Sequence, residues 1–246
     1  MKRFAAIAVA LACSSAASAS EYPAKPIRII AQFTPGSSTD ILARIVAQKM
    51  GRDWNQQVVV DNRGGGSGII ATEIVAHAAA DGYTLLCISS AFTINASLFP
   101  KLPYDSVKDF TAVAPLSAGP ALLVVHPSVP VKTMKELIVL AKAKPLVYGS
   151  SGTGSPGHIT FELIKRMSGG DITHIPYKGM GPALVDLLGG QVQMAAPGIS
   201  VAIPHVKSGR LRPIAVTSAK RWATVPEVPT VAEAALPGFE SVLWYG

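Results

Sequence analysis

Glycines and hydroxyl residues gather in two short segments, and these residues are the ones best suited to chemistry. The first turn, residues 33–40, reads Phe-Thr-Pro-Gly-Ser-Ser-Thr-Asp, and the second turn, residues 149–158, reads Gly-Ser-Ser-Gly-Thr-Gly-Ser-Pro-Gly-His. Each follows a strand-like apolar run and precedes a helical pattern. Such a turn presents backbone N–H groups and hydroxyls at the positive end of a helix dipole, which favours an anion. Two such turns predict two lobes that close on one small anionic ligand.

Better-known glycine-rich motifs match neither turn. The second turn has the glycine spacing of a P-loop, but no lysine follows Gly154, and Thr153 stands where a nucleophile elbow needs its last glycine. A third loop, residues 62–68, lacks the last glycine of a dinucleotide-binding fingerprint because Ile69 occupies that position. The alternative for each of these loops is a tight turn without a ligand.

The histidines and acidic residues show no metal or catalytic spacing. No two of the five histidines stand four residues apart, so we expect no metal site. Asp40 lies near a helix start and is interpreted as a helix-stabilising carboxylate, whereas His158 could contact a ligand or cap its own turn. The alternative function is a secreted hydrolase that uses Ser151 or Ser155 with His158 as the base, because catalytic triads assemble from distant residues.

Strand and helix patterns alternate along the chain, which predicts an α/β fold with open, mainly parallel sheets. The expected strands cover residues 27–33, 57–61, 84–89, 121–126, 146–148, 173–176, 191–195 and 212–217. Helices are expected between them, with Ser155 as an N-cap and capping boxes that begin at Thr133 and Thr230. In such sheets ligands bind beyond the carboxyl ends of strands, where both turns lie.

The first residues form a secretory signal peptide, with a basic start, a short apolar run and small residues at positions 17–19. We expect residues 1–19 to be removed and the mature chain to begin at Ser20 in the periplasm. Lipidation at Cys13 is the alternative.

Two lobes are expected from the order of the patterns. Residues 20–126 and 212–246 are assigned to lobe 1 and residues 127–211 to lobe 2. The chain is expected to cross between the lobes near residues 126–130 and again near residues 212–218.

The net charge is +7 over 246 residues, and the basic residues are scattered without interleaved aromatic residues. This distribution argues against nucleic acid as a partner and gives a mild preference for anionic ligands. Cys87 is the only cysteine beyond the leader, and its apolar neighbours indicate a buried thiol and not a nucleophile. We expect no cofactor and a monomeric protein.

A series of short motifs runs in order from about residue 20 to the last residue. They are Tyr22-Pro23-x-Lys25-Pro26-Ile27-Arg28, Pro35-Gly36 with Asp40, Asp61-Asn62-Arg63, Ala80-Asp81-Gly82-Tyr83-Thr84-Leu85-Leu86, Lys101-Leu102-Pro103-Tyr104-Asp105, Tyr148-Gly149-Ser150-x-Gly152-x-Gly154-Ser155 with His158, Pro176-Tyr177-Lys178-Gly179 and Pro226-x-Val228-Pro229-Thr230. As a set they resemble the periplasmic solute receptors of tripartite tricarboxylate transporters, the Bordetella uptake protein family.

This resemblance implies a type II periplasmic binding-protein fold, with two lobes and a ligand cleft between them. It implies a receptor without enzymatic activity that binds a small carboxylate and delivers it to integral-membrane transporter subunits. A ligand-binding partner of a membrane sensor is the alternative. Carried over residue by residue, the ligand-binding residues are Phe33, Pro35, Gly36, Ser37, Ser38, Asp40, Ser150, Gly152, Gly154, Ser155 and His158.

Two departures from the family pattern affect these expectations. Ser37 stands where the family usually has a second glycine, which restricts the backbone of the first turn. The family also continues beyond the motif that matches Trp244-Tyr245-Gly246. The sequence is therefore expected to be a C-terminally truncated form in which lobe 1 is incomplete.

Overall fold

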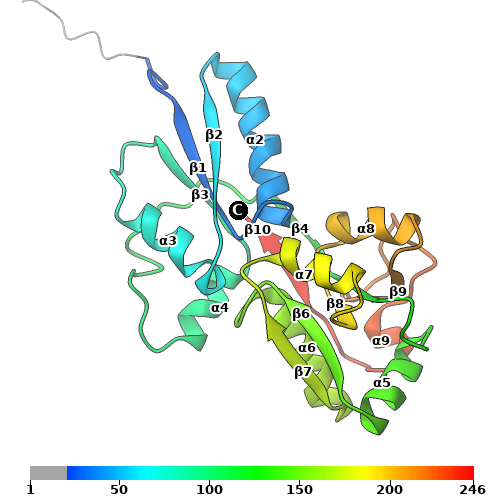
Figure 1. Ribbon diagram of the computed structural model, residues 1–246. Helices are drawn as coiled ribbons and strands as arrows, with labels where there is room; N and C mark the ends of the chain where they lie inside the picture. Colours follow the sequence, from blue (N-terminus) through cyan, green and yellow to red (C-terminus); the bar gives the residue numbers. More distant parts are fainter. Residues whose placement is uncertain (1–20) are drawn as a thin grey trace, which may run out of the picture.

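The computed structural model describes residues 21–246, and its elements form two parts that lie side by side (Figure 1). The predicted signal peptide, the cleavage site before Ser20 and the alternative lipidation at Cys13 lie outside these residues. Within the described range, no helix combines the length and the apolar character that crossing a membrane requires.

The first part is built on a three-stranded parallel sheet in the order β2-β1-β3. Its elements are β1 (Ile27–Gln32), α2 (Ser38–Trp54), β2 (Val58–Arg63), the 3-10 turn η1 (Gly66–Gly68), α3 (Ile69–Ala76), β3 (Thr84–Cys87) and α4 (Ala91–Leu98). Small residues of α2, Ala43 and Ala47, pack on Ile29, Ala31 and Cys87 of the sheet. This close packing places the start of α2 directly beyond the carboxyl end of β1.

The second part is built on a five-stranded mixed sheet in the order β7-β6-β8-β5-β9. Its elements are β5 (Leu122–Val125), α5 (Met134–Ala143), β6 (Leu146–Ser150), α6 (Pro156–Ser168), β7 (Ile172–Pro176), α7 (Met180–Leu188), β8 (Met194–Ala195), α8 (Ile199–Lys207), β9 (Arg212–Val216) and α9 (Val231–Ala234). All four residues of β5 are fully buried. Alternate side chains enter two cores: Leu123 lies in a cluster with residues of α5 and α6, and Leu122 in one with residues of α7 and α8.

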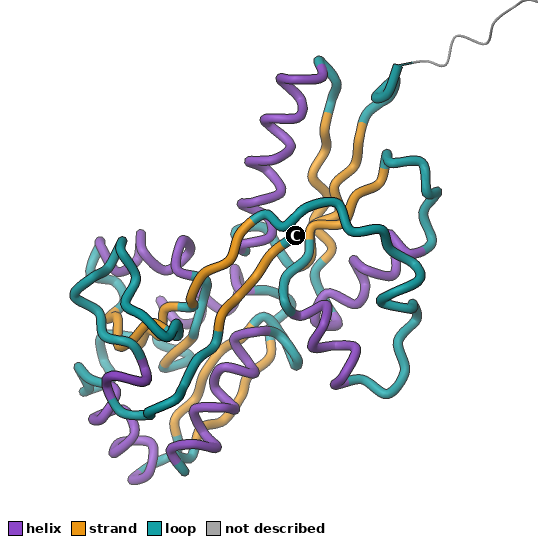
Figure 2. The backbone as a smooth tube through the Cα atoms, turned by 180° about the vertical axis from the view of Figure 1, so that it is seen from behind, coloured by secondary structure: helices purple, strands orange, loops and turns teal. Residues whose placement is uncertain are grey.

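Two further strands run between the two parts. β4 (Ser117–Pro120) and β10 (Val242–Tyr245) pair antiparallel, and Figure 2 shows them side by side across the middle of the molecule. Beyond the end of β3, Ser90 N donates to Trp244 O at 3.0 Å, and at the other end of β10 Ser241 N donates to Thr217 O at 2.8 Å. β10 is therefore hydrogen-bonded to both parts.

The predicted α/β class is confirmed, and each of the eight predicted strands is found with shifts only at its ends. Ser155 caps α6 with Pro156 in its first turn, and both predicted capping boxes are present. The strands β4 and β10 were not predicted. β4 reads Ser-Ala-Gly-Pro, which has neither apolar alternation nor β-branched residues.

The chain crosses between the two parts at other positions than those predicted from the sequence. β5 and β9, which were expected at the edges of lobe 1, are antiparallel neighbours in the five-stranded sheet, with Leu122 opposite Val216. The strands that run between the parts are β4 and β10. An apolar run marks a buried strand, but it carries no information about which strand will be its neighbour, so the crossings were placed one strand too far into the second part.

Candidate ligand-binding site

A cavity of about 40 Å³ lies where the two parts meet. Its walls come from the first turn, from the second turn, from the starts of α7 and α8, and from β10. The lining residues are Phe33, Ser37, Ser38, Thr39, Ser89, Ser151, Pro156, Gly157, Met180, Ala196, Pro197, Gly198, Leu243 and Tyr245. A wider depression between α4 and α6 is lined by Thr93, Ile94, Ser97, Leu98 and Ile159, of which two carry hydroxyl groups and three are apolar.

Four helices begin at this cavity. Ser37 caps α2, Pro156 and Met180 are the first residues of α6 and α7, and Gly198 is the N-cap of α8. Each helix start carries about half a positive charge from the aligned peptide dipoles. Among residues 21–246, no lysine, arginine or histidine lines the cavity. Positive potential here therefore comes from the backbone, which favours a small anion.

Backbone N–H groups remain available at the cavity wall. For residues 21–246 the structure records no acceptor for the N–H groups of Ser38, Thr39 and Gly157, all of which belong to the first turn of a helix. The hydroxyl groups of Ser38, Ser151 and Tyr245 are on the same wall. Burial raises the pKa of Tyr245, so its phenol stays protonated and can donate a hydrogen bond.

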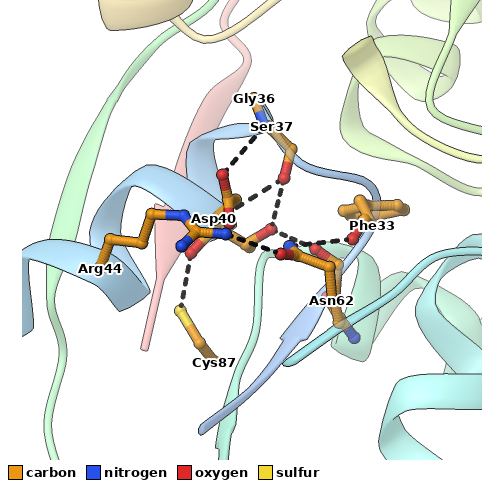
Figure 3. Close-up of polar contacts among 9 residues, drawn as sticks. Phe33, Gly36, Ser37, Asp40, Arg44, Asn62 and Cys87 are labelled. Carbon is orange, nitrogen blue, oxygen red and sulfur yellow. Dashed lines mark hydrogen bonds and ion pairs between the residues drawn. The ribbon is translucent and has the colours of Figure 1, made fainter. Parts of the chain in front are cut away.

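The N-cap Ser37 and the α2 residue Asp40 hold the first turn in shape with their side chains (Figure 3). Ser37 Oγ accepts from Asp40 N, and Asp40 Oδ2 accepts from Gly36 N at 2.9 Å. Phe33, at the end of β1, has φ = +72°, a left-handed conformation that is rare for residues other than glycine. The side chain of Phe33 is buried and forms part of the cavity wall. Polar side chains of the turn thus hold part of its shape in the absence of a ligand.

The second turn is held by a buried hydroxyl and imidazole network. Ser150 Oγ lies 2.6 Å from His174 Nε2, and Ser155 Oγ donates to Ser150 Oγ at 3.2 Å. Gly152 N donates to Ser150 Oγ, and Gly154 N donates to His158 Nδ1, both at 3.1 Å. The N–H groups of these two glycines are therefore already paired inside the protein.

The eleven predicted site residues divide into two groups. Phe33, Ser37 and Ser38 line the cavity. Pro35, Gly36 and Asp40 belong to the first turn, and Ser150, Gly152, Gly154, Ser155 and His158 to the second, but none of these eight is among the lining residues. The second turn faces the cavity with the neighbouring residues Ser151, Pro156 and Gly157 instead. Whether each residue contacts a ligand stays a prediction.

Several lining residues were missed by the sequence analysis. Ser89 follows β3, and Gly198 lies between β8 and α8, so each occupies the same kind of place, beyond the end of a strand, as the two turns. That position was the available signal for both. Tyr245 reaches the cavity through β10, and no local pattern marks it.

The two parts also touch through glycines around the cavity. A Cβ atom on Gly179 would lie 2.2 Å from Thr34 Oγ1 and 2.7 Å from Thr34 N, and one on Gly152 would lie 2.9 Å from Ser67 Oγ. Ser67 Oγ also donates to the carbonyl of Thr153. The parts therefore approach closely enough that side chains larger than hydrogen at these positions would separate them.

Comparison with known proteins decides the family. The family described as tripartite tricarboxylate transporter family receptor matches residues 42–246. The chain belongs to this family. Among curated relatives, the protein BugT of Bordetella pertussis is 40% identical over 232 residues, which cover 93% of this chain and 71% of that protein. Members of the family are periplasmic solute-binding receptors.

Solved structures of family receptors agree with the fold. The Rhodopseudomonas palustris protein Rpa4515 with adipate is 39% identical, with a TM-score of 0.89, and the match covers 92% of this chain and 76% of that one. MatC from the same organism, with bound malate, is 33% identical, with a TM-score of 0.85, and the match covers 92% and 78% of the two chains. The two-lobed periplasmic binding-protein architecture is thereby confirmed.

The serine hydrolase considered from the sequence has no support in this site. The ring of His158 accepts from Gly154 N, and only its backbone N–H contacts Ser155. The serine that does meet an imidazole, Ser150, is fully buried, and in the part of the chain that the structure describes no carboxylate is hydrogen-bonded to its partner His174. Across residues 21–246 no cluster of three or more histidine, cysteine, aspartate or glutamate side chains could hold a metal ion. The receptors of this family and its structural neighbours are solute-binding proteins, not enzymes.

Unfolding of this receptor should become easier as the pH falls from about 6.5 towards 4. Burial, together with neighbouring His158, lowers the pKa of His174 to about 4, so between these pH values the unfolded chain binds the proton more readily than the folded one. The stability from this group is complete above pH 6.5 and declines below it, by about 1 kcal/mol after allowance for solvent near the half-buried ring.

Urea unfolding at pH 7 and pH 5 measures the change. His174→Gln should reduce this dependence and the exposed His77→Gln should not. An equal dependence in all three proteins would contradict the assignment.

Proposed function

We propose that this chain is a periplasmic solute receptor that holds a small carboxylate between its lobes and delivers it to membrane subunits of a tripartite tricarboxylate-type transporter. The proposal includes removal of residues 1–19 as a signal peptide during export. The observation that carries it is the convergence of four helix N-termini, contributed by both parts, on one cavity without basic side chains. The adipate and malate held by two family receptors are small carboxylates of the expected kind.

The available N–H groups suggest how the carboxylate is held. The N–H groups of Ser38 and Thr39 in the first part and of Gly157 in the second could donate to its oxygens, with the hydroxyl of Ser38 or Ser151 beside them. The remaining residues predicted from the sequence, among them Asp40, Ser155 and His158, would shape the two turns without touching the ligand. Because the donors come from both parts, a ligand can bind all of them only when the lobes are closed. Ligand binding therefore stabilises the closed arrangement.

Thermal unfolding with added acids tests the proposal. We expect one acid among adipate, malate, citrate, glutamate and benzoate to stabilise residues 20–246. At about a hundred times its dissociation constant the gain should be roughly 2.7 kcal/mol. Adipamide, which has the same chain as adipate but no charge, should give no shift. A cooperative transition that none of these acids shifts would contradict the proposal.

A variant that fills the cavity tests whether the added acid stabilises the protein by binding at this site. A Cβ atom on Gly198 would lie 2.6 Å from Ser38 Oγ and 3.1 Å from Tyr245 Oη, so Gly198→Val should remove the shift. Gly189→Ala is the matched control, because a Cβ there makes only ordinary contacts at 3.4 Å and 3.8 Å. Delivery to a transporter would be tested by uptake of the labelled acid in cells with and without the receptor gene.

A further inference from the structure

We infer that Arg44 and Asn62 are positioning residues of the anion site. With Asp40 they hold the first turn in its binding shape, and the Arg44 guanidinium offsets the negative charge that Asp40 places beside the site. Neither residue lines the cavity. The inference rests on the proposed function, since the charge argument requires an anionic ligand.

A chain of hydrogen bonds links these residues to Phe33 and Gly36 of the first turn. Asp40 Oδ2 accepts from Gly36 N at 2.9 Å, and its other oxygen accepts from Arg44 Nε at 2.9 Å. An Arg44 terminal nitrogen then donates to Asn62 Oδ1 at 3.2 Å, and Asn62 Nδ2 donates to Phe33 O at 3.4 Å. Figure 3 shows Asp40 between Gly36 and Arg44, with Asn62 beyond the guanidinium. The chain therefore runs from Gly36, through α2 and β2, back to Phe33.

The backbone at Phe33 needs such support. Its φ of +72° is unfavourable for a residue with a Cβ atom, and its side chain forms part of the cavity wall. The carbonyl of Phe33 is held by Asn62 from the neighbouring strand, and the carbonyl before it accepts from the hydroxyl of Thr39. Without these bonds the turn could relax to an ordinary conformation and move the wall of the site.

The charge of Asp40 would by itself oppose an anion. Its side chain is only 6% exposed and belongs to the first turn of α2, next to the cavity residues Ser38 and Thr39. An unpaired carboxylate there would repel a bound carboxylate and weaken the field of the helix start. Arg44 lies one helical turn farther along and forms an ion pair with Asp40. The other guanidinium groups on the adjoining strands, those of Arg28 and Arg63, are both paired with Asp61.

Adipate and malate titrations of four variants test the charge component. Arg44→Gln should weaken binding about tenfold, and Arg44→Lys should recover part of the loss, because the positive charge returns but the bridge to Asn62 does not. In Arg44→Gln with Asp40→Asn the affinity should also recover, since asparagine still offers an oxygen to Gly36 N but carries no charge. Arg52→Gln, an exposed arginine in the last turn of the same helix, is the matched control and should change nothing. Equal losses in Arg44→Gln and in the double variant would overturn the charge argument.

Hydrogen exchange of the Gly36 amide tests the positioning component without a ligand. In the free protein its exchange should accelerate about tenfold in Arg44→Gln and in Asn62→Ala, whereas Arg52→Gln should match the wild type. Unchanged exchange in both variants would overturn the positioning role. If the wild-type protein bound no acid at all, the proposed function would fail, and the Gly36 measurement would still decide whether Arg44 and Asn62 hold the turn.

Discussion

Gly179→Ala should weaken carboxylate binding at least a hundredfold while leaving the unfolding midpoint of the free protein nearly unchanged. A Cβ atom at this position would lie 2.2 Å from Thr34 Oγ1 and 2.7 Å from Thr34 N, and the second of these atoms is backbone that cannot swing aside. Gly179 has φ = +167°, extended backbone that alanine also adopts, so the penalty arises only when the two parts meet. A hundredfold loss corresponds to about 2.7 kcal/mol, a modest cost for a contact of this kind.

Calorimetric titration with adipate and malate measures this effect, and Gly189→Ala is again the matched control. That glycine lies at the opposite end of α7 and has room for a methyl group. Small-angle scattering of the variant with excess ligand should show a more extended molecule than the liganded wild type. Wild-type affinity in Gly179→Ala would mean that ligand binding does not require the contact between Gly179 and Thr34.

Phe161→Ala should lower the free energy of unfolding by about 3–5 kcal/mol, the range for removing a large side chain from a packed core. Phe161 is fully buried on α6, in one cluster with residues of α5, β6 and β7. Its ring stacks on Tyr148 at a centroid distance of 4.2 Å, and Tyr148 in turn stacks on His174 at 4.9 Å. Because His174 meets Ser150 in the second turn, the cavity left by the substitution should also loosen the turn and weaken adipate binding.

Denaturant unfolding at neutral pH checks the size of the loss. Val139→Ala on α5 is the control, since Val139 is 68% exposed and should change stability by less than about 0.5 kcal/mol. For a domain of this size, a loss of 3–5 kcal/mol should lower the thermal midpoint by roughly 10 °C. A loss below about 1 kcal/mol would show that the side chains around Tyr148 rearrange to fill the space left by the Phe161 ring.

A site built from helix starts and hydroxyl groups suits a receptor that must release its ligand. In the proposed site, backbone donors would hold a carboxylate without a permanent counter-charge, and three of these donors, on Ser38, Thr39 and Gly157, are divided between the two parts. When the parts separate, each retains only some of the donors. Affinity is then governed by closure and not by any single strong ion pair.

Local features of the fold were predictable from the sequence because they depend on residues a few positions apart. The Ser155 cap of α6 and the capping boxes at Thr133 and Thr230 are bonds between neighbours three residues apart in the chain. Buried strands were visible as apolar runs. The location of both turns beyond strand ends followed from the alternation of strands and helices, and so did the expectation of an anion site between them.

Tertiary structure decided which face of each turn meets the cavity. In the second turn, Ser150 and Ser155 point their hydroxyl groups into the network around His174, and Ser151 and Gly157 line the cavity instead. Tyr245 and Gly198 join the wall because β10 and β8 pair with strands distant in sequence. Such pairings, and the rotation of a turn about its helix, depend on contacts across the whole molecule. The residue types therefore predicted helix starts and hydroxyl groups where the two parts meet, while long-range packing selected which of these groups line the cavity.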